Sequence, residues 1–579
     1  SKASRALHVA EDLFGGINAV ARGGRVVFEE FIECGKGRDM GFTSVNGFEQ
    51  KISGSSGTIS MSRDLFRLHK GMDALRVFSL YFSGPGFFIS MMQTAWCVYL
   101  YILAHAALAV ADLEIYRVYR YFKMTETQTS LSLSREEGGY YNSIYAIQLG
   151  FLSVLPLFLK MSVDRGVRDG FNYVVSTLVQ GSWAFNIFTM TTKGYNYMRA
   201  LLFGQAQYIA TERGYVLANA SMVVLYGLYA KSHLYQGMEL LVYLLLFHMN
   251  TQLPVSFLYS WSVWMFALCV VIAPWWFSPQ AANLFWMRHS WLDWRRWIDG
   301  NFNQPRVSHG SWASWHAHMM ANWREMLSPW YKILTVCTSG SGRIILALVC
   351  VASLNNGAQT RGVEQRRQFA HNAGRMAVAA SFTMLLAAVY YLAMRSKTLA
   401  RGRWLAFPER LWKLSVYRGL VRVAMLTTWV GCYAVFSYDL SFHSRQDASR
   451  TFVMTILGCV SIASLLVESW VMIGNRDIEH VFDWLTPLQN RHGPSHWRSI
   501  FAQPLVMTLR HLLLRLRNFA DFWYCEMDKA CGAVIFALLF ALSLLPIASL
   551  QSALVWNETF SELVRKRVEV ERTVNDVIG

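Results

Sequence analysis

The strongest constraint on this chain is a series of apolar runs, each about as long as a lipid bilayer is thick. A transmembrane helix needs about 20 consecutive apolar residues. The 579-residue chain is 54% hydrophobic and only 16% charged, whereas a soluble protein carries about 25% charged residues. We therefore predict a polytopic, mostly α-helical membrane protein. The expected spans are approximately residues 84–111, 144–162, 236–252, 256–277, 332–354, 376–394, 419–438, 452–473 and 532–553.

A tenth apolar run, residues 171–191, contains Asn, Gln, Gly and Ser and is ambiguous as a span. Positive charge guides its interpretation, because cytoplasmic loops carry an excess of Lys and Arg. If this run does not cross, the basic segments 278–330, 395–418 and 474–531 all lie on the cytoplasmic side with the N-terminal segment. We therefore predict that residues 171–191 are interfacial or re-entrant. The net charge of +17 is spread over many loops, which argues against nucleic-acid binding.

Residues 1–80 differ from the rest of the chain because they are rich in charge. They hold eleven Lys or Arg and nine Asp or Glu. Within them, residues 59–80 place apolar side chains at helical spacing among basic ones. That pattern is typical of a helix lying on a membrane surface. We predict that residues 1–58 are the end of a cytosolic domain and that residues 59–80 form an amphipathic interfacial helix.

The predicted spans divide the rest of the chain into four parts. Residues 84–277 form a transmembrane and interfacial region, 278–330 a cytosolic loop, 331–553 a transmembrane bundle and 554–579 a C-terminal tail. Within the loop, residues 286–323 carry Trp every few positions. The first interpretation of these residues is a belt of indole rings at headgroup depth. The alternative is a surface on which sugar rings stack.

Two short motifs contain acidic residues that could take part in chemistry. In "HVAEDLFGG", Glu11 and Asp12 are adjacent, and a carboxylate near an acceptor hydroxyl can act as a general base. An acidic pair at a helix N-terminus is a common alternative. The triplet Ser62, Arg63 and Asp64 opens the amphipathic segment, where a serine is usually only a helix cap.

A third motif, "ECGKGRDMGF" at residues 33–42, combines three glycines with Lys36, Arg38 and Asp39. Glycines let a backbone approach a ligand closely, and the two basic side chains suit a phosphate group. The motif is neither a Walker loop nor a dinucleotide fingerprint. Taken alone, it fits an ordinary solvated turn better than a ligand loop.

The order of these motifs resembles the 1,3-β-glucan synthases, which comprise fungal cell-wall glucan synthases and plant callose synthases. The stretch "SKASRALHVAEDLFGGINAVARGGRVVFEEFIECGKGRDMGF", followed by "SMSRDLFRL", is similar to the family blocks "KA…LH…ED…AG.N…LR.G", "Q.GKGRD.G" and "LSR(E/D)…LG". Further similar blocks follow in the same order: "TTKGYNYMRALLFGQAQYIATERGYV", "YAKSHLYQGMELLVYLLLF", "APWWFSP…WLDWRRWIDG…SWASW" and "WNETFSELVRKRVEV". The resemblance extends from residue 1 to about residue 572 in block order.

The sequence also departs from the family pattern. The block "GGAKYR.TGRG" of the family is "GQAQYIATERG" here, with Gln207 in place of Lys and Glu212 in place of Gly. These differences leave the detailed role of residues 204–214 open. The resemblance also implies that the chain starts partway through the central cytosolic domain of the family, which has a GT-A-like glycosyltransferase fold. We then expect the nucleotide-binding part of that domain to precede this chain.

The resemblance implies processive transfer of glucose from UDP-glucose to the 3-hydroxyl of a growing β-1,3-glucan, with inversion and extrusion through the membrane. Asp12, assisted by Glu11, is the implied catalytic base. Lys36 and Arg38 are the implied ligands of the diphosphate, which must be held as it leaves. Asp39 would anchor Arg38. No metal ligand or other cofactor is expected in this segment, and a need for a divalent metal stays open.

The same resemblance places Ser62, Arg63 and Asp64 at the entrance of the channel, where the acceptor meets the catalytic domain. The expected partners are UDP-glucose, the growing glucan, the lipid bilayer and, as in fungi, a Rho-type GTPase. The expected location is the plasma membrane with the N-terminal part in the cytoplasm. Two alternatives are a secondary transporter or channel, and an inactive fragment of a synthase. The in-span acids Glu239 and Glu468 lie near span ends, whereas transporters carry ionisable groups at mid-membrane.

Overall fold

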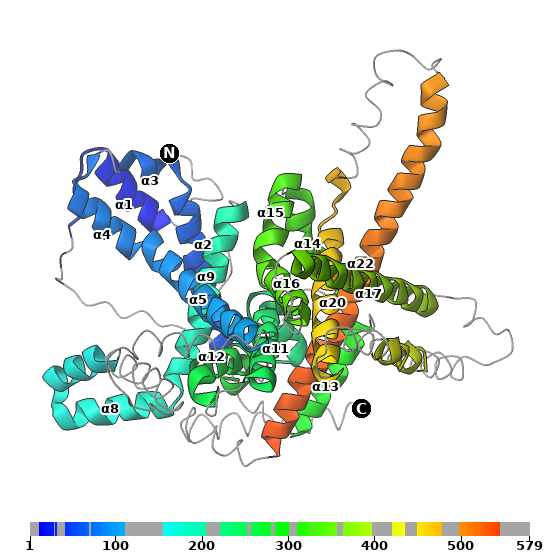
Figure 1. The fold of residues 1–579 in the computed structure, drawn as a ribbon. Helices are drawn as coiled ribbons and strands as arrows, with labels where there is room; N and C mark the ends of the chain where they lie inside the picture. Colours follow the sequence, from blue (N-terminus) through cyan, green and yellow to red (C-terminus); the bar gives the residue numbers. More distant parts are fainter. Residues whose placement is uncertain are drawn as a thin grey trace, which may run out of the picture.

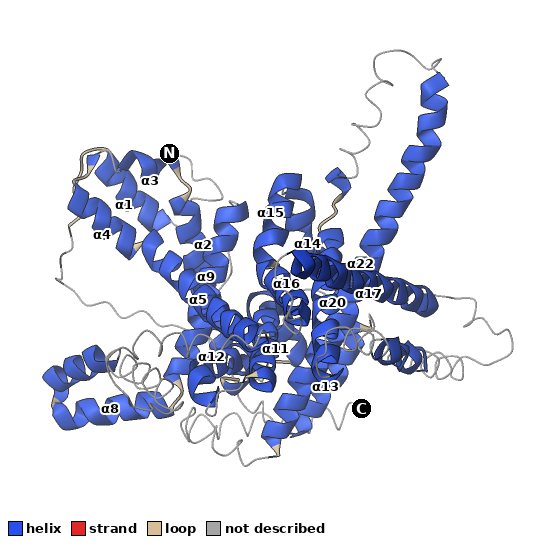
Figure 2. Ribbon diagram, viewed as in Figure 1, coloured by secondary structure: helices blue, strands red, loops and turns tan. Residues whose placement is uncertain are grey.

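The computed structural model is built from helices throughout the part of the chain that it describes. Every regular element in that part is a helix and none is a strand (Figures 1 and 2). The mostly α-helical fold expected from the sequence is therefore confirmed. The described residues are 11–27, 29, 31, 41–68, 71–110, 154–203, 220–251, 256–278, 284–299, 310–326, 328–355, 363–395, 420–425, 427–432, 434, 448–477 and 497–544.

Three helices are long and apolar enough to cross a membrane, among the residues described. They lie in α5 (Pro85–Val110), α17 (Val363–Arg395) and α20 (Ala448–Val471). A fourth candidate is the pair α15 (Pro329–Ser339) and α16 (Ser341–Asn355), which is bent by 55°. All four coincide with predicted spans, so the chain is a membrane protein.

The main apolar core lies where α5, α16, α17 and α20 meet α11 (Tyr235–Asn250) and α12 (Ser256–Trp276). Figure 1 shows these helices crossing at the centre of the molecule. Burial of such side chains in contact with one another is the main favourable term in helix packing. The fully buried members include Ile102, Ala106, Leu240, Leu244, Ala267, Val270, Cys350, Met376 and Cys459.

The described part of the charged N-terminal segment contains four helices. They are α1 (Glu11–Ala21), α2 (Phe42–Ser60), α3 (Arg63–Leu68) and α4 (Ala74–Ser83). Residues 59–80 therefore contain the end of α2, all of α3 and most of α4 rather than one continuous helix. A new helix starts after Asp73 because its carboxylate accepts a hydrogen bond of 2.8 Å from the Arg76 backbone N–H.

The ambiguous run at 171–191 is divided between two helices. α8 (Val167–Val179) ends at Gln180, and α9 (Ser182–Phe203) begins after Gly181. Gly181 has a φ of +81°, a backbone conformation that only glycine adopts without strain. The run therefore does not form a single straight helix. Its predicted interfacial or re-entrant position stays a prediction.

Four tryptophans of the loop 286–323 lie inside the protein. They belong to α13 (Leu284–Ile298) and α14 (Trp312–Ala321) and pack against α10 (Met222–Tyr229) and α22 (Trp497–Ser543). The belt interpretation is therefore wrong for these rings, because a ring at headgroup depth would face lipid. These buried rings are Trp294, Trp297, Trp312 and Trp315.

Candidate functional site

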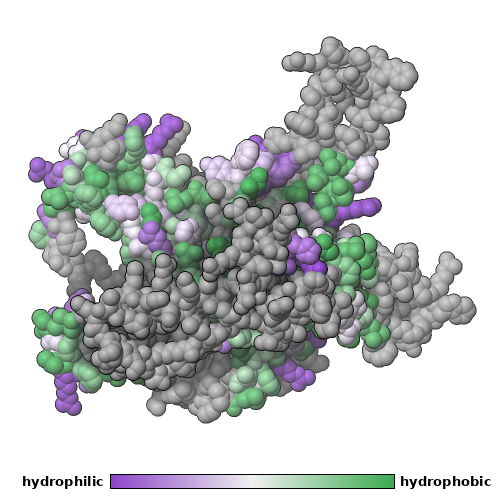
Figure 3. Space-filling view, in the orientation of Figure 1, coloured by the Kyte–Doolittle hydropathy of each residue, from purple (hydrophilic) through white to green (hydrophobic). Residues whose placement is uncertain are grey.

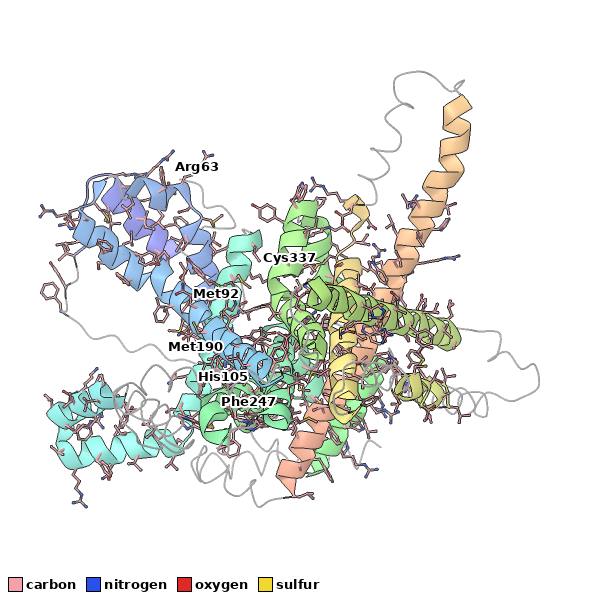
Figure 4. The ribbon with its side chains drawn as sticks, in the orientation of Figure 1. Arg63, Met92, His105, Met190, Phe247 and Cys337 are labelled. Carbon is pink, nitrogen blue, oxygen red and sulfur yellow. The ribbon has the colours of Figure 1, made fainter. Side chains whose placement is uncertain are left out.

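The structure brings together two of the three predicted acidic and basic motifs. α1 packs against α3, and Phe14 and Ile17 of α1 contact Ile59 at the end of α2. Glu11 is the first residue of α1. Asp12 and Arg63 are both exposed, and Figure 4 shows Arg63 at the outer end of this group of helices.

The role of Ser62 as a helix cap is confirmed, because its hydroxyl accepts a 3.3 Å hydrogen bond from the Leu65 backbone N–H. Asp64 is half-buried and lies 3.9 Å from the guanidinium of Arg67, one turn further along α3. Lys36, Arg38 and Asp39 lie outside the described residues.

Helix α2, which follows the "GKGRD" motif, packs closely along α9. A Cβ atom at Gly57 would lie 2.9 Å from the Tyr197 carbonyl oxygen and 2.6 Å from the Ala200 Cβ, so only glycine allows this approach. The Lys193 ammonium lies 3.3 Å from the Glu49 carboxylate across the same interface. The surface of the N-terminal helices mixes hydrophobic and hydrophilic side chains (Figure 3).

Helix α9 is joined in turn to the π-helix η3 (Ala230–Leu234) through the buried His233. Burial lowers the pKa of His233 to about 3, so the ring is neutral. Its Nε2 lies 3.0 Å from the Phe188 carbonyl oxygen and donates a hydrogen bond to it. The ring also stacks on Phe188, with 3.8 Å between the centroids. Figure 4 labels Met190 on α9 and Met92 on α5, two helices that pack against each other.

Asp528 of α22 lies at the centre of the aromatic core formed by α10, α13 and α14. The hydroxyl groups of Tyr226 and Tyr235 donate hydrogen bonds of 2.7 and 2.5 Å to Oδ1, and the Trp312 indole N–H donates one of 2.6 Å to Oδ2. Burial raises the pKa of Asp528, and these hydrogen bonds oppose that rise. The carboxylate therefore joins three segments that are distant in sequence.

Asp521, two turns before Asp528, binds two more side chains. His316 Nε2 lies 3.1 Å from its Oδ1, and the Arg324 guanidinium, from the π-helix η4 (Asn322–Met326), donates to the same oxygen. Burial would raise the pKa of Asp521, but these two partners hold it below its usual value. Arg324 also donates a 2.8 Å hydrogen bond to the Val471 carbonyl, so η4 joins α22 to the end of α20.

A third polar junction lies among the apolar helices. The Arg343 guanidinium of α16 lies 2.7 Å from the Glu468 carboxylate and 3.7 Å from that of Glu239. Tyr243 donates a 2.8 Å hydrogen bond to Glu239, and its oxygen lies 3.1 Å from that of Tyr99. The two in-span acids thus share one arginine, which matches the rule that charges among membrane helices are paired.

Sequence reasoning missed Asp521, Asp528, Arg324 and Arg343. Arg343 could have been recognised, because it is a lone arginine inside the apolar run 332–354. Asp521 and Asp528 could not, since they lie in a segment with many other charged residues. Among the described residues, no group of three or more His, Cys, Asp or Glu side chains is arranged to hold a metal ion.

These junctions and the apolar helices define a polytopic α-helical membrane protein with a charged N-terminal group of helices. A protein-family model described as "1,3-beta-glucan synthase component" matches residues 1–340. This match covers more than half of the chain, and the chain therefore belongs to the 1,3-β-glucan synthase family.

Similar curated proteins are callose synthases of Arabidopsis thaliana. Callose synthase 7 is 31% identical over 319 residues, and callose synthases 5 and 4 are each 32% identical over 319 residues. In each case the alignment covers 54% of this chain and 16% of the relative. The chain thus matches about a sixth of the length of these relatives.

Proposed function

We propose that this chain is the membrane-spanning, acceptor-side part of a 1,3-β-D-glucan synthase that uses UDP-glucose. In this proposal the enzyme transfers glucose processively to the 3-hydroxyl of the glucan, inverts the anomeric carbon and extrudes the polymer through the membrane. The cytosolic side of the plasma membrane is the proposed place of transfer. A Rho-type GTPase is a proposed regulator by family resemblance.

One observation carries the proposal: three sequence blocks shared with the family lie on helices that pack together. The "GKGRD" motif leads into α2, α2 packs against α9, and α9 contacts η3 through His233. The block 191–216 begins on α9, and the "YAKSHL" block contains η3. Residues that are far apart in the chain therefore lie around one junction, as an active site requires.

The proposed chemistry uses the exposed N-terminal helices. Asp12 would accept the proton of the sugar hydroxyl, with Glu11 beside it in sequence on the first turn of α1. Lys36 and Arg38 would stabilise the negative charge that develops on the departing diphosphate. Arg63 would lie where the acceptor enters, since α3 packs against α1 and precedes the first span.

The proposal is tested in a membrane-embedded enzyme that contains this chain. Lys36→Ala is expected to abolish incorporation of labelled glucose from UDP-glucose into an alkali-insoluble product that 1,3-glucanase digests. Arg168→Ala, at an exposed position on α8, is the matched control and is expected to retain synthesis. Both variants should be present in the membrane in equal amounts.

Normal glucan output from Lys36→Ala would reject the role of this motif. Absence of labelled glucan from the unmodified enzyme, combined with uptake of a solute into vesicles, would favour the transporter alternative. Absence of both activities would favour an inactive fragment. Glu239 and Glu468 both lie within ion-pair distance of Arg343. These two carboxylates are therefore paired, and they do not support the transporter alternative.

A further inference from the structure

The N-terminal part of α22 carries an apolar stripe that passes from the protein interior to its surface. At the inner end, Phe519 and Trp523 pack against α17 and α20. Leu509, Leu512 and Leu516 continue the same stripe, because spacings of three and four residues place side chains on one face of a helix. Phe519 is 6% exposed, whereas Leu512 is 50% exposed. The stripe therefore changes from covered to uncovered within about two turns.

This change occurs where α22 passes the end of a candidate membrane span. The span in α20 covers Phe452–Val471, and the centroid of the Phe519 ring lies 6.0 Å from that of Trp470. At about 1.5 Å per residue, Leu512 and Leu509 lie about 10 and 15 Å further along α22. The headgroup layer adds only about 5–8 Å on each side of the hydrocarbon core. A helix that leaves the bilayer along the span axis therefore carries these leucines into water, and Figure 1 shows this end of α22 extending away from the other described helices.

Basic side chains line both edges of the stripe. Their positions on the helix place Arg515 on one edge and Arg510 and Arg517 on the other. Arg510 and Arg515 are exposed, and Arg517 donates a 3.1 Å hydrogen bond to the Asn475 side chain. Residues 497–520 contain four arginines and no Asp or Glu. The surface offered by this part of α22 is therefore apolar in the middle and positive along both edges.

Charge and position decide which kind of partner fits this surface. A second copy of the chain would bring arginines against arginines in either orientation, since both edges are basic. A lipid surface would cover the stripe only at headgroup depth, and the distances along α22 place Leu509 and Leu512 beyond it. An amphipathic helix with acidic edges fits, because two-helix packing combines leucine contacts in the middle with charge pairs at the edges.

We propose that residues 507–518 of α22 bind an acidic amphipathic helix of a partner protein, on the side of the membrane where the α20 span ends at Val471. The basic segment 474–531 is predicted to face the cytoplasm, so the partner is a cytoplasmic protein. An exposed apolar surface rimmed by charge is typical of a protein–protein interaction site. The interaction needs neither the sugar donor nor the glucan, so it is independent of the proposed synthase activity.

The test measures binding of a designed peptide to the complete 579-residue chain in nanodiscs of neutral phosphatidylcholine. The probe is a fluorescent helical peptide with Leu along one face and Glu along both edges of that face, and a matched peptide has Lys in place of Glu. Fluorescence anisotropy should show saturable binding of the Glu peptide and at least tenfold weaker binding of the Lys peptide. Leu512→Gln should weaken binding of the Glu peptide at least tenfold. Leu178→Gln, at an exposed leucine of α8, is the matched control and should bind like the unmodified chain.

Reversal of charge separates a specific contact from general attraction. The double variant Arg510→Glu with Arg515→Glu should lose the Glu peptide and bind the Lys peptide at least tenfold more tightly than the unmodified chain does. Both side chains are exposed, and the melting temperature of each variant shows that it is folded. No binding of either peptide, equal binding of the two by the unmodified chain, or unchanged binding by Leu512→Gln would overturn the proposal.

Two further measurements address the other kinds of partner. A fluorophore attached at residue 512 should be quenched little by phosphatidylcholine that carries a spin label on its headgroup; strong quenching would assign the stripe to the lipid surface and reject the proposal. Mass photometry in detergent should give the same distribution of species for the unmodified chain and for Leu512→Gln. A dimer that Leu512→Gln dissociates would assign the stripe to a second copy and would also reject the proposal.

Discussion

Two junctions hold the family-matched helices together, and they do so by opposite means. Between α2 and α9, small side chains such as Gly57 and Ala200 let two backbones approach each other. Around Asp528, large aromatic side chains surround one carboxylate that accepts three hydrogen bonds. The first junction requires a residue without a Cβ atom, and the second requires a carboxylate. A larger side chain at the first junction should therefore destabilise the protein, and so should loss of the hydrogen-bond acceptor at the second.

The largest expected effect is at the carboxylate junction. Asp528→Ala leaves the hydroxyls of Tyr226 and Tyr235 and the indole N–H of Trp312 without their acceptor. Each buried unsatisfied donor costs about 1–3 kcal/mol, so the loss of stability should be about 3 kcal/mol or more. Denaturant unfolding in detergent micelles, followed by tryptophan fluorescence, measures it. Asp528→Asn should lose less, because one carbonyl oxygen remains; equal losses would contradict this account.

A smaller effect is expected when volume is added between α2 and α9. Gly57→Ala places a methyl group 2.6 Å from Ala200 and 2.9 Å from a backbone oxygen of α9, so the helices must separate. Overpacking of this kind costs about 1–3 kcal/mol. Gly54→Ala is the matched control, because a Cβ there meets nothing within 4 Å. Gly54→Ala should keep or raise stability, because alanine has the higher helix propensity; a loss at Gly54 as large as at Gly57 would contradict the close-packing explanation.

The polar contact at the end of the same interface should contribute less. Tyr197 donates a 3.0 Å hydrogen bond to the Ser60 hydroxyl. Ser60→Ala removes the acceptor, and a neutral hydrogen bond contributes about 1 kcal/mol. The same unfolding measurement should show this loss, and Tyr197→Phe should show a similar one. The double variant should lose less than the sum of the two; full additivity would mean that the contact contributes nothing.

A separate expectation is a pH dependence of stability that comes from Lys231 of η3, whose ammonium nitrogen lies 3.6 Å from the sulfur of Met320 on α14. The pKa of Lys231 falls from 10.5 to about 7 in the folded chain. Between these values the unfolded chain binds a proton that the folded chain lacks, so stability rises with pH from 7 to about 10. Lys231→Met removes this titration, and its melting temperature should rise less between pH 7 and 9.5. A parallel rise in both proteins would contradict the shift.

The sequence predicts features that are set within one continuous segment. It does not predict contacts between two segments that are distant in the chain. Residues 84–111 and 452–473 are identifiable as spans because a span needs only length and apolarity. The pairing of Arg343 with Glu468 joins residues 125 positions apart, and no local pattern indicates it. Trp312 and Trp315 illustrate the same limit. Tryptophan density fits a headgroup belt or a core equally well, and only the packing of α13 and α14 against α10 and α22 decides between them.

The candidate site shows this division clearly. The cap at Ser62 follows from local sequence and is confirmed. The contact of Phe14 on α1 with Ile59 at the end of α2, and the packing of α1 against α3, are not specified by periodicity alone. The roles of Glu11 and Asp12 come from the order of motifs along the chain and stay proposals.

The length of α22 has a consequence for the reach of the molecule. At 1.5 Å per residue, its 47 residues extend about 70 Å, more than twice the thickness of a bilayer's hydrocarbon layer, about 30 Å. Figure 1 shows one end of α22 standing apart from the other described helices. The segment from Asp528 back to Trp497 extends about 46 Å, so a tilt of about 10° at Asp528 would displace the far end of this segment by about 8 Å.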